Sequence, residues 1–249
     1  MLSKNQSKYI QSLHQKKFRQ LHGAFLVEGA KSVQEVLSAD FTIELLVSTE
    51  AFYKENSRLT DHQQTPVEIV SVADLERLGT LESNNAALAV VRTKENRPLV
   101  AEPGEIVLVL DDIRDPGNLG TILRIADWYG VRKILCSETT ADVYNPKVIS
   151  ASKGSFTRVS WWYGDLTAVL AGAGQFPVYG AFLDGINVHE LTFDQGGYLI
   201  MGNESNGIRP ATGAFVTNRV TIPRFGETES LNVGIATAIL LDNWRRVTG

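Results

Sequence analysis

Apolar and polar residues alternate along the first hundred residues in a way that predicts short strands separated by helices. Apolar runs of β type occur at FLVE, IELLVS, VEIV and ALAVV. Helical segments are predicted at 30–38 and 50–56. A third begins after Ser71, whose hydroxyl can accept a hydrogen bond from a free amide at the helix start. The pattern predicts a small α/β sandwich.

Beyond residue 105 the predicted strands become continuous apolar runs, which is typical of strands that helices bury on both faces. The best candidates are EIVLVLDD, KILCS, PVYGAF, YLIMGN and RVTIP. Helices are predicted between them, at 119–129, 145–152, 166–173, 208–216 and 231–246. This alternation predicts an α/β domain with a parallel sheet.

A polar stretch separates the two patterns. It reads VRTKENRPLVAEPGE, and its prolines and glycine are typical of a linker. We therefore expect two domains, at residues 1–97 and 105–249.

The amino-terminal segment Lys4–Leu21 has the spacing of an amphipathic helix. It is basic, although the chain as a whole has a net charge of −4, which argues against nonspecific coating of nucleic acid. Five basic and no acidic residues precede Glu28: Lys4, Lys8, Lys16, Lys17 and Arg19. The segment is either an arm that contacts RNA phosphates or a solvated helix face, and composition alone leaves both open.

Composition narrows the class of protein. The chain has 249 residues, 43% of them hydrophobic and 21% charged, which excludes a disordered or collagen-like protein. No apolar run approaches the roughly 20 residues of a membrane span, and the amino terminus lacks the apolar core of a secretory signal. We expect a cytoplasmic protein with no membrane contact. Its single cysteine, Cys136, excludes an internal disulfide, and its scattered histidines predict no metal site.

Ligands of parallel sheets gather where strands end and loops meet helix starts. Three such loops are rich in glycine, proline and asparagine: DDIRDPGNLGTILRIADWYG, MGNESNGI and IPRFGETESLNV. The sequence contains neither GxGxxG between a strand and a helix nor GxxxxGK[ST], so a Rossmann dinucleotide site and a P-loop are not expected. GxSxG and HExxH are also absent, which leaves serine hydrolysis and metal hydrolysis without candidates.

In order and spacing, these loops resemble the three motifs of the SpoU (TrmH-type) RNA ribose 2′-O-methyltransferases. FLVEGAKSVQEVL resembles the L30-like substrate domain of members that modify ribosomal RNA. The resemblance covers nearly the whole chain. It implies an L30-like α/β domain followed by a SPOUT-type α/β domain with a carboxy-terminal trefoil knot. It also implies S-adenosylmethionine as methyl donor, RNA as substrate and a homodimer as the active unit.

The resemblance places the cofactor on the second and third motifs. Gly202, Ile222 and Leu231 fall where the backbone cradles it, Ser230 lies beside them, and Phe182 borders the adenine. This agrees with the residue types, because a glycine permits close approach and the two aliphatic side chains supply apolar walls. The alternative for each is ordinary core packing at a strand end.

The resemblance also implies the catalytic residues. Asn118 and Arg124 match the pair of the first motif, in which the arginine is catalytic, Glu204 falls at the active site, and Asn232 lies where it can contact substrate or cofactor. A guanidinium stays protonated at neutral pH. We therefore interpret Arg124 as holding a substrate phosphate and stabilising the developing 2′-oxyanion, with the role of general base as the alternative.

Bland alternatives exist for these polar residues too. Arg124 could form a surface salt bridge with Asp127, Glu204 could hold its own turn, and Ser230 could cap the last helix. Two positions depart from the family pattern: Arg224, where many members carry methionine, offers a further phosphate contact, and Gly234 lowers helix propensity. We expect neither to take part in the chemistry.

The predicted function is S-adenosylmethionine-dependent 2′-O-methylation of RNA, with ribosomal RNA as substrate. Transfer RNA is the alternative substrate. A noncatalytic RNA-binding, ribosome-associated protein is the alternative class.

Overall fold

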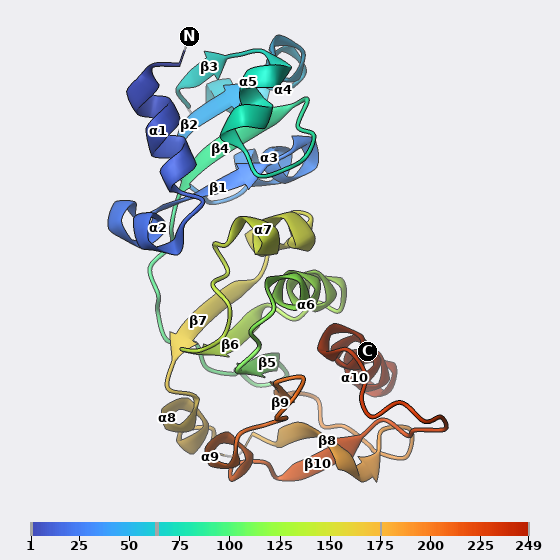
Figure 1. Cartoon of the computed structure of the whole chain (residues 1–249). Helices are drawn as coiled ribbons and strands as arrows, with labels where there is room; N and C mark the ends of the chain where they lie inside the picture. Colours follow the sequence, from blue (N-terminus) through green and yellow to red (C-terminus); the bar gives the residue numbers. More distant parts are fainter. Residues whose placement is uncertain (1, 63–64, 175, 249) are drawn as a thin grey trace. The chain divides into compact units, whose positions relative to one another are not determined.

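The computed structural model describes residues 2–62, 65–174 and 176–248, and divides into two compact units (Figure 1). Met1–Glu95 and Asp142–Thr157 form the first, and Asn96–Ala141 and Arg158–Gly249 form the second. Within the described part of the chain, no helix is long and apolar enough to cross a membrane.

The first unit is built on a four-stranded mixed sheet. Its strand order is β1-β4-β2-β3, with β4 antiparallel to both neighbours and β3 parallel to β2. The strands are β1 (Ala24–Glu28), β2 (Ile43–Ser48), β3 (Val67–Ile69) and β4 (Ala87–Arg92). The helices are α1 (Lys4–Ser12), α2 (Lys16–His22), α3 (Ala30–Leu37), α4 (Glu50–His62) and α5 (Val72–Leu78). The predicted strands and the helix start after Ser71 are confirmed.

The predicted continuous helix Lys4–Leu21 is wrong, because the chain leaves the helix after Ser12 and re-enters it at Lys16. Arg19 explains the break. Its Nη1 donates to the carbonyls of Leu13 and His14 at 3.0 and 2.9 Å, and its Nη2 pairs with Asp142 at 2.6 Å. Only 3% of Arg19 is exposed, so it holds the fold together and is not part of an RNA-contacting arm.

Residues 142–157 lie beyond the predicted linker but pack with the first unit. They form α7 (Pro146–Ser152) and the short 3-10 helix η1 (Ser155–Thr157). The ring of Phe25 on β1 lies 4.6 Å from that of Tyr144 and 6.1 Å from that of Phe156, centroid to centroid. An aromatic cluster thus joins the two ends of this unit's sequence.

The second unit is a six-stranded sheet in which every neighbouring pair is parallel, with strand order β10-β8-β9-β5-β6-β7. Its strands are β5 (Ile106–Asp111), β6 (Lys133–Ser137), β7 (Ser160–Gly164), β8 (Val178–Asn187), β9 (Gly197–Gly202) and β10 (Asn218–Thr221). Its helices are α6 (Pro116–Trp128), α8 (Leu166–Ala171), α9 (Pro210–Gly213) and α10 (Val233–Thr248). The predicted parallel-sheet α/β domain is confirmed.

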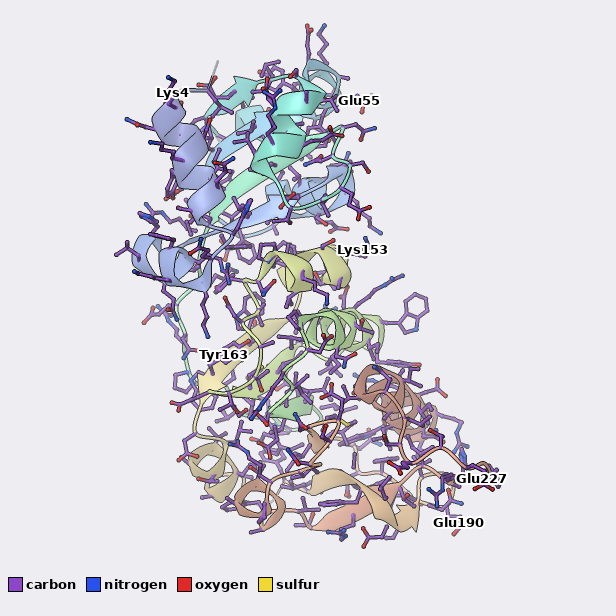
Figure 2. All side chains as sticks on the ribbon, in the orientation of Figure 1. Lys4, Glu55, Lys153, Tyr163, Glu190 and Glu227 are labelled. Atoms are coloured by element: carbon purple, nitrogen blue, oxygen red, sulfur yellow. The ribbon has the colours of Figure 1, made fainter. Side chains whose placement is uncertain are left out.

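Strand β7 was not predicted. It is an edge strand of aromatic residues, Trp161, Trp162 and Tyr163, that are only half-buried, so it lacks the continuous apolar pattern of β5. The Asn96 amide closes its free side, donating to the Tyr163 carbonyl and accepting from the Tyr163 N–H, both at 2.8 Å. Figure 2 marks Tyr163 on this strand.

The carboxyl half of α10 is anchored in the core. Trp244 is fully buried, its ring stacks on Phe193 at 4.8 Å between centroids, and its Nε1 donates to the Asp194 carbonyl at 2.8 Å. Buried aromatic rings of this kind contribute strongly to packing. This anchor fixes the helix whose amino end lies at the site described next.

Candidate active site

The three loops singled out in the sequence meet at the carboxyl edge of the parallel sheet. The loops after β5 and β9 start side by side, because Asp111 and Gly202 are paired in register. The third loop leads from β10 into α10, and α10 packs against α6. Gly234 permits this approach, since a Cβ there would lie 3.1 Å from Thr121 Cγ2. The topology therefore gathers segments that lie about a hundred residues apart.

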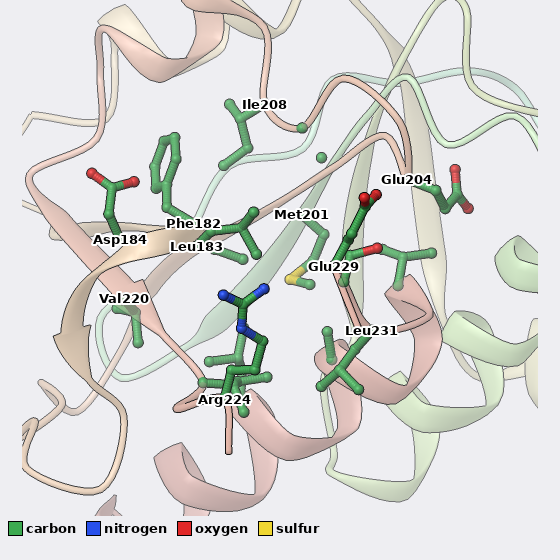
Figure 3. Close-up of a pocket in the computed structure, with 18 of the residues that line it drawn as sticks. Phe182, Leu183, Asp184, Met201, Glu204, Ile208, Val220, Arg224, Glu229 and Leu231 are labelled. Carbon is green, nitrogen blue, oxygen red and sulfur yellow. The ribbon is translucent and has the colours of Figure 1, made fainter. Parts of the chain in front are cut away.

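A cavity of about 580 Å³ lies among these loops (Figure 3). Its lining includes every residue that was expected to hold the cofactor: Phe182, Gly202, Ile222, Ser230 and Leu231. Met201, Ile208 and Val220 add apolar wall. The volume lies within the roughly 300–1,000 Å³ of small-molecule sites, which combine apolar walls with a few polar groups in this way.

Gly202 is required by the chain's own backbone. A Cβ at this position would overlap the backbone of Gly207 and Ile208, which the loop folds back against the end of β9. Asn203 and Gly207 close that loop with paired hydrogen bonds of 3.0 and 2.9 Å. The reason for a glycine here is therefore the turn itself, before any ligand is considered.

Asn203 organises the same loop and was missed in the sequence. Its Oδ1 accepts from the N–H groups of Ser205 and Asn206, and its Nδ2 donates to the carbonyl of Asp112 at 2.8 Å. It therefore fixes the second motif loop to the first. Asparagine directly after a strand and before a turn is the available signal, because its side chain readily replaces a backbone partner there.

Three of the four expected catalytic residues form one hydrogen-bonded chain. Asn118 Nδ2 donates to Glu204 Oε1 at 2.6 Å, and Asn232 Nδ2 donates to Asn118 Oδ1 at 2.8 Å. Glutamate offers only acceptors when ionised, which fixes the orientation of the Asn118 amide. The chain joins all three motif loops, and Glu204 carries it to the lining of the cavity.

Asn232, not Ser230, caps the last helix. The helix begins at Val233, and Asn232 Oδ1 accepts from the N–H groups of Gly234 and Ile235 at 2.9 and 3.3 Å. The cap interpretation of Ser230 is therefore wrong. Capping fixes Asn232 so that its Nδ2 points at Asn118.

Arg124 is exposed on α6 and lies outside the lining of the cavity. Asp127 pairs with Arg158 at 2.9 Å and with Arg132 at 3.4 Å, so the alternative of an Arg124–Asp127 salt bridge is wrong. Across the described ranges, Arg124 forms no ion pair or side-chain hydrogen bond. Its charge is available to a ligand, but this chain alone does not bring it to Glu204.

Two further acidic residues at the end of β5 were missed. Asp111 is completely buried and accepts from the N–H of Arg209 at 2.8 Å and from its Nε at 2.7 Å, which ties β5 to the start of α9. Asp112 adopts the left-handed conformation, with φ of 64°. Burial raises the pKa of Asp112, but hydrogen bonds from Arg114 and Thr139 and the nearby guanidinium charges outweigh it and lower the pKa overall.

The charged residues that line the cavity are Asp184, Glu204, Arg224 and Glu229, three acids and one base. Phe182 is held from outside, because the Arg219 guanidinium stacks 3.6 Å from its ring centroid and pairs with Asp184 at 2.6 Å. In the part of the chain that the structure covers, no group of three or more His, Cys, Asp or Glu side chains could hold a metal ion.

Comparison with family models matches two segments. Residues 105–242 match the SpoU rRNA Methylase family, and residues 4–89 match the MRM3-like substrate binding domain. Among curated proteins, the chain is 29% identical to the 23S rRNA (guanosine(2553)-2′-O)-methyltransferase RlmP of Bacillus subtilis, over 98% of this chain and 97% of that one.

Solved structures agree with the family models. The chain is similar to a putative RNA methyltransferase of the TrmH family from Porphyromonas gingivalis, with 38% identity, 99% of each chain covered and a TM-score of 0.88. It is also similar to an AdoMet-bound rRNA methyltransferase from Sinorhizobium meliloti, with 27% identity, 99% and 96% covered and a TM-score of 0.89. The resemblance carried by the three motifs is confirmed, and the chain belongs to the SpoU rRNA Methylase family.

Proposed function

We propose that this protein transfers a methyl group from S-adenosylmethionine to a ribose 2′-hydroxyl of ribosomal RNA. The observation that carries the proposal is the chain Glu204–Asn118–Asn232, which joins the three motif loops at the edge of the cavity. The names of the relatives support it, since the Bacillus subtilis protein is a 23S rRNA 2′-O-methyltransferase and the Sinorhizobium meliloti structure holds AdoMet.

The cavity suits this cofactor. S-adenosylmethionine supplies a methyl group bound to a cationic sulfonium. Glu204 and Glu229 give the lining negative charge that favours a cation, and Met201, Ile222 and Leu231 supply apolar wall. In this proposal Gly202, Ile222 and Leu231 hold the cofactor, Ser230 lies beside it and Phe182 borders the adenine.

The polar residues act on the RNA. Arg124 holds a phosphate and stabilises the negative charge that develops on the 2′-oxygen as its proton leaves. Asn118 keeps the Glu204 carboxylate at the cavity, and Asn232 fixes the Asn118 amide. Positioned groups of this kind lower the barrier because they need no rearrangement during reaction.

We also propose a homodimer. Large apolar side chains are exposed on α6 and at the amino end of α10: Trp128 is 83%, Ile235 54% and Leu231 44% exposed. Apolar groups exposed to this extent mark interaction surfaces. Arg124 lies on the same helix as Trp128, so a second copy that covers this face would reach the catalytic arginine. The mass in solution of a Trp128→Glu variant tests this.

In the same proposal, residues 1–97 bind RNA and residues 105–249 carry the methyl transfer. Lys4, Lys8, Lys16 and Lys17 are all exposed on α1 and α2, and Lys4 projects outward in Figure 2, so these four lysines support an RNA-contacting arm without Arg19. The cytoplasmic location and the carboxy-terminal trefoil knot stay predictions.

The test is methyl transfer by the purified protein. Ribosomal RNA and transfer RNA are incubated separately with methyl-labelled S-adenosylmethionine, and the digested nucleosides are identified by mass spectrometry. A labelled 2′-O-methylnucleoside from ribosomal RNA is expected. Label only in transfer RNA would favour that substrate, and cofactor binding without transfer to either RNA would favour the noncatalytic alternative.

A further inference from the structure

Arg224 is the only basic residue among the described residues that line the cavity. Two of the three acidic lining residues already have partners, because Asp184 pairs with Arg219 at 2.6 Å and Glu204 accepts from Asn118 at 2.6 Å. Glu229 has no ion pair within the described ranges. The cavity therefore holds one uncommitted positive side chain and one uncommitted negative one.

Arg224 is weakly held in its present position. Its side chain extends from the third motif loop into the cavity (Figure 3), and its Nη1 donates to the Thr228 carbonyl at 3.3 Å. A guanidinium has five N–H donors in a planar fork that matches a carboxylate. Among the residues that the structure describes, no carboxylate pairs with this fork, so it can accept an anionic ligand at the cavity.

The chemistry of the cofactor identifies that anion. S-adenosylmethionine has one anionic group, its α-carboxylate, together with an α-ammonium and the sulfonium. A guanidinium near either cation would oppose binding, whereas a bidentate pair with the carboxylate would favour it. Glu229 lies in the same loop, five residues further on, and offers an acceptor for the ammonium.

We propose that Arg224 and Glu229 together recognise the amino-acid end of the cofactor, Arg224 through its carboxylate and Glu229 through its ammonium. The proposal rests on the proposed function and extends it to residues that the family motifs do not assign. Arg224 stands where many members carry methionine, so this chain has a contact at the cofactor that those members lack.

A phosphate of the RNA is the competing ligand for Arg224. The position of the side chain favours the cofactor, because Arg224 lines the same cavity as Gly202, Ile222 and Leu231. A residue that served only the RNA backbone would be expected on the outer surface with the lysines of α1 and α2.

Calorimetric binding of three ligands tests the proposal without any turnover. S-adenosylmethionine and S-adenosylhomocysteine both carry the amino-acid end, and 5′-methylthioadenosine lacks it. We expect Arg224→Met to weaken binding of the first two roughly ten- to hundredfold, the range for a hydrogen bond to a charged group, and to leave 5′-methylthioadenosine within twofold. Glu229→Gln should show the same selectivity, and Arg132→Met, a surface control, should change none of the three.

Other results would overturn the proposal. Equal weakening of all three ligands by Arg224→Met would mean a structural role for the loop, and unchanged binding of all three would remove Arg224 from the cofactor site. Unchanged cofactor binding with weaker, less salt-dependent RNA binding would assign Arg224 to a phosphate. If the unmodified protein bound none of the three, the proposed function itself would fail.

Discussion

Arg124→Ala separates a catalytic arginine from a structural one. The side chain is exposed and has no partner within the described ranges, so its removal takes away no contact of the folded chain. Exposed substitutions of this kind change the free energy of unfolding by at most about 0.5 kcal/mol, which corresponds to roughly 1–2 °C in the melting temperature of a protein of this size. Stability should therefore be nearly unchanged.

The rate of methyl transfer should respond very differently. Loss of one preorganised donor to a developing oxyanion costs at least about 100-fold in rate, or about 2.7 kcal/mol of transition-state stabilisation. Arg124→Lys keeps the charge but loses the planar fork, so we expect it to recover little of the rate. Single-turnover methylation with saturating RNA and cofactor is the assay, because it reports the chemical step rather than binding.

Arg132→Ala is the matched control. Arg132 is also exposed in the second unit, but it pairs with Asp127 at 3.4 Å, an interaction worth about 0–1 kcal/mol at a surface. We expect a small loss of stability and a rate within twofold of the unmodified protein. A near-normal rate for Arg124→Ala, or a rate loss that follows a loss of stability, would refute the catalytic assignment and leave Glu204 as the next candidate.

Three further predictions follow from the structure. Replacing Lys16 and Lys17 by Ala should reduce the salt dependence of RNA binding by up to about 0.7–0.9 log units per contact at unchanged cofactor affinity, whereas Arg19→Ala should cost about 3–5 kcal/mol in denaturant unfolding because it leaves Asp142 unpaired. Gly202→Ala should lower both cofactor affinity and melting temperature, because the added Cβ meets the turn itself; loss of affinity with unchanged stability would contradict this. Burial raises the pKa of Cys136 to about 12, so its thiol should resist alkylation at pH 8 until the protein is unfolded, and rapid labelling of the native protein would contradict the burial.

The fold was predictable where local pattern and tertiary packing agree. Strands β5 and β9 are buried on both faces, and a continuous apolar run is the direct consequence. Strand β7 escaped because an edge strand with half-buried aromatic residues has no such run. The break between α1 and α2 could not be predicted, since Arg19 is held by Asp142, 123 residues away.

The site divides in the same way. The cavity residues were predictable because each motif is a local loop at a strand end, where parallel sheets place their ligands. Asn203 and the Asp111–Arg209 pair were missed because their partners lie 91 and 98 residues away in the sequence. Asn232 was singled out for substrate or cofactor, yet its oxygen caps a helix while its nitrogen serves the site.

The most direct test of the central claim is the ribose methylation of ribosomal RNA in cells that lack this protein. Mass-spectrometric mapping should show one 2′-O-methylated nucleotide lost on deletion of the gene, restored by the unmodified protein and not by Arg124→Ala. An unchanged ribosomal RNA methylation pattern in the deletion strain would contradict the account.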